Sequence, residues 1–316
     1  MALPTPAGAA VASDGRIVFA SEAKSGSEIW AMNPDGSAPV RLTNAHPDGQ
    51  PAVSPDATRI AFTSHRESVD QIWVMNADGT GQHRLTDGTL ADSFPTWSPD
   101  GRRIVFARLE IGHTDLWIMD ADGRGQRRLT QNDEFAPDYH PTFSPDGRHI
   151  AFTSIRNDER GENADIWRVE VDGSHLTRLT TDPAFDTDPS YSPDGSRIAF
   201  SSNRDGTAAI FVMNADGSDQ RRVTDDAGFD HVPAFSPDGT RIAFAGDSRG
   251  GTDAIWVIKL DGSGLTCVTT DAASDSYPSW ARRHAGETTN GSGSGGGSPG
   301  LPAPVGCLIA LPGSAP

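Results

Sequence analysis

Six aspartates recur at one position of the sequence, each three residues before a proline. Carboxylates gathered on one side of a fold could hold a hard cation such as Ca²⁺, which takes several carboxylate oxygens as ligands. Two carboxylates about 6 Å apart repel by roughly 3 kcal/mol at an effective dielectric constant of about 20, so an uncompensated ring would attract a counter-ion. The six residues are Asp48, Asp92, Asp138, Asp186, Asp230 and Asp275.

Six basic residues could neutralise these aspartates from within the protein. Each lies in a segment of variable sequence that follows an apolar strand, where it could form an ion pair with an aspartate of a neighbouring repeat. The sequence leaves two interpretations open, one with aspartates that cap loops and pair internally and one with an acidic ring that binds Ca²⁺. The basic residues are Lys24, Arg66, Arg108, Arg156, Arg204 and Arg249.

Two histidines lie in the same segments as the aspartates. His140 follows Asp138 closely and His231 is next to Asp230. Imidazole and carboxylate groups are suitable ligands for a transition metal. No two histidines share the short spacing typical of a zinc site, so His140 and His231 form only a weak alternative metal site.

A repeated turn and strand must position all of these residues. A Ser-Pro-Asp-Gly turn, or a variant of it, precedes an apolar strand such as Ile-Ala-Phe six times, with a period of 42 to 48 residues. Proline presets φ at the second turn position, and glycine closes the turn. The turn aspartates are Asp14, Asp56, Asp100, Asp146, Asp194 and Asp238.

Each period contains four strand signals, which in the third unit are residues 95–98, 103–107, 115–119 and 127–130. Four antiparallel strands in about 40–50 residues are typical of a propeller blade. The sequence therefore predicts an all-β, six-bladed β-propeller. A first-strand pattern without later strands recurs at residues 277–280, and we expect it to complete the first blade and close the ring.

The prediction divides the chain into three parts. Residues 1–12 form an N-terminal extension, and residues 13–281 form the propeller. Residues 282–316 are rich in Gly, Ser and Pro, and we expect them to be a disordered tail.

The repeats resemble those of the TolB family and its WD40-like relatives. The third unit shows the shared pattern in Pro95-Thr96-Trp97-Ser98-Pro99-Asp100-Gly101, followed by an apolar strand, Leu-Trp-Ile-Met and Asp-Gly. The resemblance implies protein–protein contacts in the bacterial cell envelope, in a periplasmic or extracellular compartment. TolB proteins also carry an α/β domain ahead of the propeller, to which nothing in this sequence corresponds, and the first residues lack the features of a signal peptide.

The net charge of −17 disfavours nucleic acid and anionic membranes as partners. No run is long enough to span a bilayer. We expect a monomeric, non-enzymatic propeller that needs no cofactor. It would dock a protein or peptide of basic character on its variable loops and channel mouth, the face that we call the top face. The alternative is a stand-alone propeller enzyme, such as a metal-dependent lyase or lactonase, with its site at the same mouth.

Overall fold

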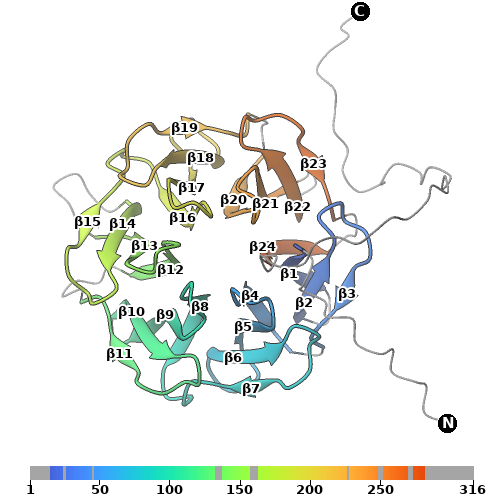
Figure 1. The fold of residues 1–316 in the computed structure, drawn as a ribbon, viewed down its shortest axis with the longest axis vertical. Helices are drawn as coiled ribbons and strands as arrows, with labels where there is room; N and C mark the ends of the chain where they lie inside the picture. Colours follow the sequence, from blue (N-terminus) through green and yellow to red (C-terminus); the bar gives the residue numbers. More distant parts are fainter. Residues whose placement is uncertain are drawn as a thin grey trace, which may run out of the picture.

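Within the residues that the structure describes, twenty-four strands form six four-stranded antiparallel sheets, which are arranged as blades in a ring (Figure 1). The computed structural model describes residues 15–23, 26–44, 46–131, 137–156, 163–225, 228–247, 252–269 and 273–281. The predicted extension (1–12) and tail (282–316) lie outside these residues, as do Lys24 and Arg249. None of the described residues forms a helix long and apolar enough to cross a membrane.

Each blade except the first is built from four strands that are consecutive in the chain. The first blade contains β1 (Ile17–Ala23), β2 (Gly26–Met32), β3 (Val40–Arg41) and β24 (Ser274–Trp280). The second contains β4 (Asp48–Val53), β5 (Arg59–Ser64), β6 (Gln71–Asn76) and β7 (His83–Arg84). The third contains β8 (Ala91–Trp97), β9 (Arg103–Glu110), β10 (His113–Asp120) and β11 (Arg127–Arg128). The fourth contains β12 (Asp138–Phe143), β13 (His149–Ser154), β14 (Asp165–Glu170) and β15 (Thr177–Arg178). The fifth contains β16 (Asp186–Tyr191), β17 (Arg197–Ser202), β18 (Ala209–Asn214) and β19 (Arg221–Arg222). The sixth contains β20 (Asp230–Phe235), β21 (Arg241–Asp247), β22 (Asp253–Lys259) and β23 (Thr266–Cys267).

The ring closes as the sequence predicts. Strand β24 pairs antiparallel with β1, so that Ile17 lies opposite Trp280 and Val18 opposite Ser279. The sheet order β24-β1-β2-β3 therefore combines the last strand with the first three. This pairing covers the edge of β1, which would otherwise expose unpaired backbone groups.

The Ser-Pro-Asp-Gly turns are held by their own side chains. In the third blade Ser98 Oγ donates to Asp100 Oδ1 over 2.5 Å, and the backbone N–H of Arg103 donates to Ser98 Oγ over 2.9 Å. The hydrogen bonds from Ser98 and from the backbone of Arg102 lower the pKa of Asp100. The turn is therefore fixed locally, which explains why it recurs with so little variation.

The core lies between neighbouring blades. The second strands contribute five fully buried phenylalanines, one in each blade after the first. One apolar cluster joins Val18 and Ile29 of the first blade to Ile60 and Phe62 of the second. Each sheet is thus apolar on both faces, as expected for a blade between two others. The phenylalanines are Phe62, Phe106, Phe152, Phe200 and Phe244.

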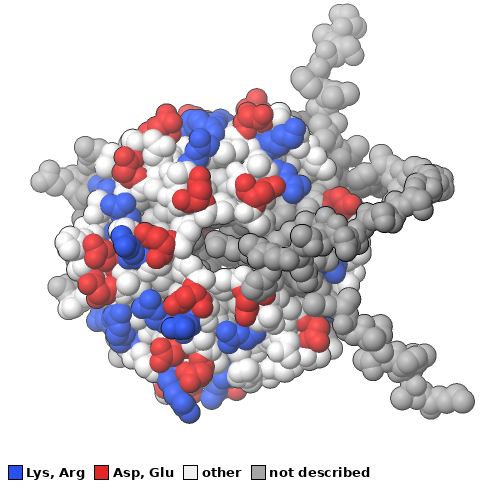
Figure 2. Space-filling view, viewed as in Figure 1, with Lys and Arg blue, Asp and Glu red and all other residues white. Residues whose placement is uncertain are grey.

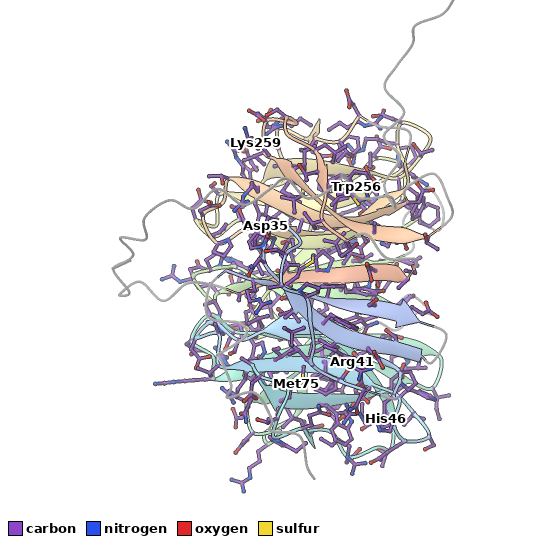
Figure 3. The ribbon with its side chains drawn as sticks, turned by 90° about the vertical axis from the view of Figure 1, so that its right-hand side faces the viewer. Asp35, Arg41, His46, Met75, Trp256 and Lys259 are labelled. Carbon is purple, nitrogen blue, oxygen red and sulfur yellow. The ribbon has the colours of Figure 1, made fainter. Side chains whose placement is uncertain are left out.

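The two faces of the propeller carry different connections (Figure 3). Asp35 and Lys259, at the hairpins between third and fourth strands, lie toward one face, which we call the turn face. His46, in a loop between blades, lies toward the opposite, top face. The loops between second and third strands share the top face, because the N–H of Asp92 bonds to the carbonyl of Asp70.

Candidate binding site at the channel mouth

Six side chains at equivalent positions form a ring at the top-face mouth of the channel. Each lies immediately before the first-strand proline, and each has a left-handed backbone with φ between 51° and 57°. The innermost strands carry a β-bulge at this point; in the second blade Gln50 and Pro51 lie opposite the single residue Phe62. We call these residues the mouth ring: Gln50, Phe94, His140, Asp188, Val232 and Tyr277.

This backbone conformation is costly for the residues that adopt it. A positive φ is a genuine outlier for a bulky or β-branched side chain such as Val232. Strain of this kind costs on the order of 1–3 kcal/mol per residue and clusters at ligand clamps and active sites. Six such residues around one opening therefore mark the mouth as the candidate site.

The mouth ring and the six prolines that follow it enclose a pocket of about 130 Å³. A second chamber of about 240 Å³ continues below it and shares the same prolines. Proline has no N–H to donate, so it suits the channel-facing edge of an innermost strand. The prolines are Pro51, Pro95, Pro141, Pro189, Pro233 and Pro278.

A histidine–aspartate pair and an aromatic cluster occupy one side of this pocket. His140 Nδ1 lies against Asp188 Oδ1. The His140 ring packs edge-on against Phe94, with ring centroids 4.0 Å apart, and it lies 4.9 Å from Tyr139 and 6.1 Å from Tyr277. The pair therefore lies within a wall of three aromatic rings.

Asp188 keeps its charge although it is buried. Burial by itself would raise the pKa of this carboxyl, but His140, the Thr187 hydroxyl and His231 together hold the pKa below its usual value. Thr187 Oγ1 donates to Asp188 Oδ2 over 2.9 Å. The pocket thus contains a buried carboxylate in its ionised form.

Gln50 organises the opposite side of the pocket. Its Oε1 accepts hydrogen bonds from Thr63 Oγ1 over 2.6 Å and from the N–H of Phe94 over 3.0 Å. A hydrogen bond from Gln50 also acts on Tyr277, whose pKa burial raises to about 12. These contacts link the first three blades around the mouth.

The six predicted aspartates are buried just outside the pocket and do not line it. Their exposed fractions are 2% or less. Among the contacts that the described residues show, four of them hold an arginine of the predicted basic set, and the arginine comes from the same blade, not from a neighbouring one as we expected. The pairs are Asp48–Arg66 (2.7 Å), Asp92–Arg108 (2.6 Å), Asp138–Arg156 (2.6 Å) and Asp186–Arg204 (2.9 Å).

These arginines also stack on aromatic rings of their blades. The guanidinium of Arg108 lies 4.6 Å from the ring centroid of Trp117, and that of Arg66 lies 4.8 Å from that of Trp73. Burial raises the pKa of Asp92, although the bonded Arg108 opposes the shift. The paired set thus stabilises the loops behind the mouth. Asp230 and Asp275 are buried at the equivalent positions.

The two predicted histidines have different partners. His140 pairs with Asp188, whereas His231 Nε2 lies 3.3 Å from Asp253 Oδ2. The hydrogen bond that His231 donates to Asp253 raises the pKa of His231 against the effect of burial.

A group with metal-ligand spacing lies elsewhere on the top face. Within the described residues it consists of Glu110, His113 and Asp115. Arg128 already forms ion pairs with both carboxylates of this group. A metal ion would therefore have to compete with a guanidinium.

Apolar side chains are exposed on the loops around the mouth. Phe185 and Phe229 precede the innermost strands of adjacent blades and are 50% and 53% exposed, and Ile111 at the β9–β10 turn is 98% exposed. Figure 2 shows the opposite, turn face, on which acidic and basic side chains are mixed without a large area of one sign.

The sequence signal for the mouth ring is variability at one repeat position. The proline and the aspartate around this position are constant, whereas the residue before the proline is different in all six blades. Sequence reasoning selected the constant aspartates and missed this variable position, apart from His140.

Comparison with known proteins supports the repeat assignment. Residues 89–161 and 157–229 match the family model described as the TolB beta propeller domain. No curated protein matches the sequence significantly.

Solved structures of TolB proteins have the same fold. TolB from Acinetobacter baumannii matches with a TM-score of 0.74 and 23% identity, over 85% of this chain and 67% of that chain. A putative TolB from Agrobacterium tumefaciens matches with a TM-score of 0.68 and 22% identity, over 86% of this chain and 93% of that chain. An oligogalacturonate lyase from Vibrio parahaemolyticus matches with a TM-score of 0.53 and 16% identity, over 81% of this chain and 74% of that chain.

These identities establish the fold alone, and the family model adds the repeat type. The described part of this chain is therefore a TolB-like six-bladed β-propeller.

Proposed function

We propose that this chain is a non-enzymatic binding propeller that docks a protein or peptide on its top face, with one part of the partner inserted between the residues of the mouth ring. The observation that carries the proposal is the left-handed backbone of all six mouth-ring residues, which surround one pocket. Strain repeated in every blade at the same opening is expected where a ligand is held.

The surroundings of the mouth support a partner larger than the pocket. The pocket volume of about 130 Å³ suits the end of one side chain. Phe185, Phe229 and Ile111 extend the apolar area onto the loops, where a docked surface would bury them. The net charge of −17 favours a partner of basic character. The resemblance to TolB, with the protein–protein contacts that it implies, supports the same class of function.

Peptide selection tests the proposal. A random peptide library displayed on phage would be selected on the immobilised propeller, and the affinities of the selected peptides would be measured for variants. We expect Phe94→Ala and His140→Ala to weaken binding at least about tenfold, the loss typical of central contacts in an interface. Arg124→Ala is the control, because Arg124 is exposed in a hairpin of the turn face.

Peptides that bind the two mouth variants as well as the wild type would overturn the proposal, as would a selection that enriches no peptide. The alternative of a metal-dependent enzyme, such as a lyase, predicts a different result. It requires a stoichiometric transition metal in the purified protein, bound through His140 and His231 and removed when either residue is replaced by alanine.

A further inference from the structure

Asp188 is the lone formal negative charge among the residues that line the mouth pocket, and no lysine or arginine lines it. Its side chain is only 8% exposed. A buried carboxylate needs a partner of opposite charge or several hydrogen bonds. The nature of that partner indicates what the pocket can receive.

The compensation of Asp188 differs from that of the neighbouring Asp186. Both carboxylate oxygens of Asp186 accept hydrogen bonds of 2.9 Å from Arg204 Nη2. Asp188 instead has the Thr187 hydroxyl at Oδ2 and the imidazole of His140 at Oδ1, neither of which is a permanent cation. Within the described residues, Nε2 of His140 has no hydrogen-bond partner. A guanidinium or ammonium group from a ligand would therefore be a stronger partner for this carboxylate than those it has within the protein.

The aromatic residues around His140, the neighbour of Asp188, favour the same kind of ligand. Phe94, Tyr139 and Tyr277 surround the imidazole with centroid distances of 4.0, 4.9 and 6.1 Å. The face of an aromatic ring is negative and attracts a cation within about 6 Å. A carboxylate within a cluster of aromatic rings is the combination that recognises alkylammonium and guanidinium groups.

We propose that the mouth pocket receives one cationic side-chain end, an alkylguanidinium or alkylammonium group, with Asp188 as its counter-ion and with Phe94 and Tyr277 against it. The pocket, with a volume of about 130 Å³, has room for one such group. The inference rests on the proposed function, because the cationic side chain would belong to the docked protein or peptide. It adds the chemical class of the group that the mouth ring binds.

Small amino-acid derivatives test the pocket without a peptide partner. Binding of N-acetyl-arginine methylamide and N-acetyl-lysine methylamide would be measured by protein-observed NMR, with the neutral N-acetyl-citrulline methylamide as the matched probe. We expect the better cationic probe to bind at least about tenfold more tightly than citrulline, the ratio expected for one charge-assisted contact. The ratio of the affinities for the arginine and lysine probes shows which of the two side chains the pocket prefers.

Two variants and a control assign the effect to the pocket. Asp188→Asn keeps the shape of the side chain and is expected to abolish the preference over citrulline. Phe94→Leu retains an apolar group without the ring and is expected to weaken the cationic probes several-fold. Asp70→Asn, a half-exposed carboxylate on a top-face loop, is expected to change nothing. Thermal melting of each variant verifies that it is folded.

Equal binding of the citrulline and cationic probes would overturn the inference, as would an Asp188→Asn variant with an unchanged preference. The inference would also be overturned if neither cationic probe bound. These results differ from failure of the proposed function. Peptides that bind the mouth ring without basic residues would retain the function and overturn the cation site, whereas cation binding without any selected peptide would retain the cation site.

Discussion

Removal of one buried arginine should reveal how strongly the top-face loops depend on the Asp–Arg pairs. Arg108 is 8% exposed and forms two hydrogen bonds with Asp92, from Nε to Oδ1 over 2.6 Å and from Nη2 to Oδ2 over 2.8 Å. It also donates to Gln126 and stacks on Trp117. In Arg108→Ala the carboxylate of Asp92, which is 0% exposed, loses its counter-ion.

The magnitude follows from the burial of the pair. Removal of one member of a buried ion pair costs about 3–5 kcal/mol, because an uncompensated charge stays in the interior. For a large domain each kcal/mol lowers the melting temperature by about 2 °C, so the expected decrease is about 6–10 °C. Asp92→Asn/Arg108→Met removes both charges and should recover at least half of the loss, because neutral replacements of buried pairs are often tolerated.

Urea unfolding of the wild type, Asp92→Asn, Arg108→Met and the double variant gives the coupling energy, and Arg108→Ala is measured beside them. The control is Arg124→Ala, since Arg124 is 85% exposed and its pair with Asp122 should contribute less than about 1 kcal/mol. Burial already raises the pKa of Asp92, so the folded variant prefers the protonated carboxyl, and its deficit should decrease as the pH falls. The reasoning fails if the free energy of unfolding of Arg108→Ala is within about 1 kcal/mol of the wild-type value.

Three further predictions concern the contact between the first and last blades, the tyrosines and calcium. Gly36→Ala places a Cβ against the carbonyl of Val268 in the last blade, whereas in the control Gly206→Ala, at a glycine whose φ is also positive, nothing lies within 4 Å of the added atom. Gly36→Ala should therefore lower the free energy of unfolding by about 1–3 kcal/mol more than the control does. Equal unfolding free energies of the two variants would contradict the clash. Burial raises the pKa of every tyrosine of the chain to about 12, so tyrosinate absorbance should be absent at pH 10 in the native protein and present in urea. For the same reason, the free energy of unfolding should decrease as the pH rises from about 10 to 12. Titration of the native protein near the usual pKa of 10.0 would refute this. Because four aspartates of the predicted ring already pair with arginine, we expect Ca²⁺ and EDTA to leave the melting temperature unchanged, whereas a rise with Ca²⁺ would indicate that the ring binds the ion. The tyrosines are Tyr139, Tyr191 and Tyr277.

The fold was predictable because each blade repeats the same local signals. The Ser98–Asp100 turn is stabilised by hydrogen bonds between residues two to five apart, so its sequence is sufficient to specify it. Ring closure was predictable for a different reason, since the first-strand pattern before Trp280 had no later strands of its own. Both features depend on patterns that can be counted.

The mouth ring was not predictable from the same patterns. A residue before proline normally has an extended backbone, and the sequence gives no reason to expect left-handed residues such as His140 and Asp188 at this position. The bulge also shifts the alternation of inward and outward side chains, so the periodicity cannot identify which residue faces the channel. The same-blade pairing of Asp92 with Arg108 likewise depends on the register of β8 with β9, in which these two residues lie opposite each other.

The pairing of β24 with β1 has a consequence for the order of folding. Blades two to six consist of consecutive strands and can form as the chain emerges during synthesis. The first blade must wait for residues made more than two hundred positions later, because Ile17 pairs with Trp280. Contacts of such high sequence separation slow folding, since loop closure precedes the gain from pairing. Until then the edge of β1 is exposed, and association between unfinished chains is the competing reaction.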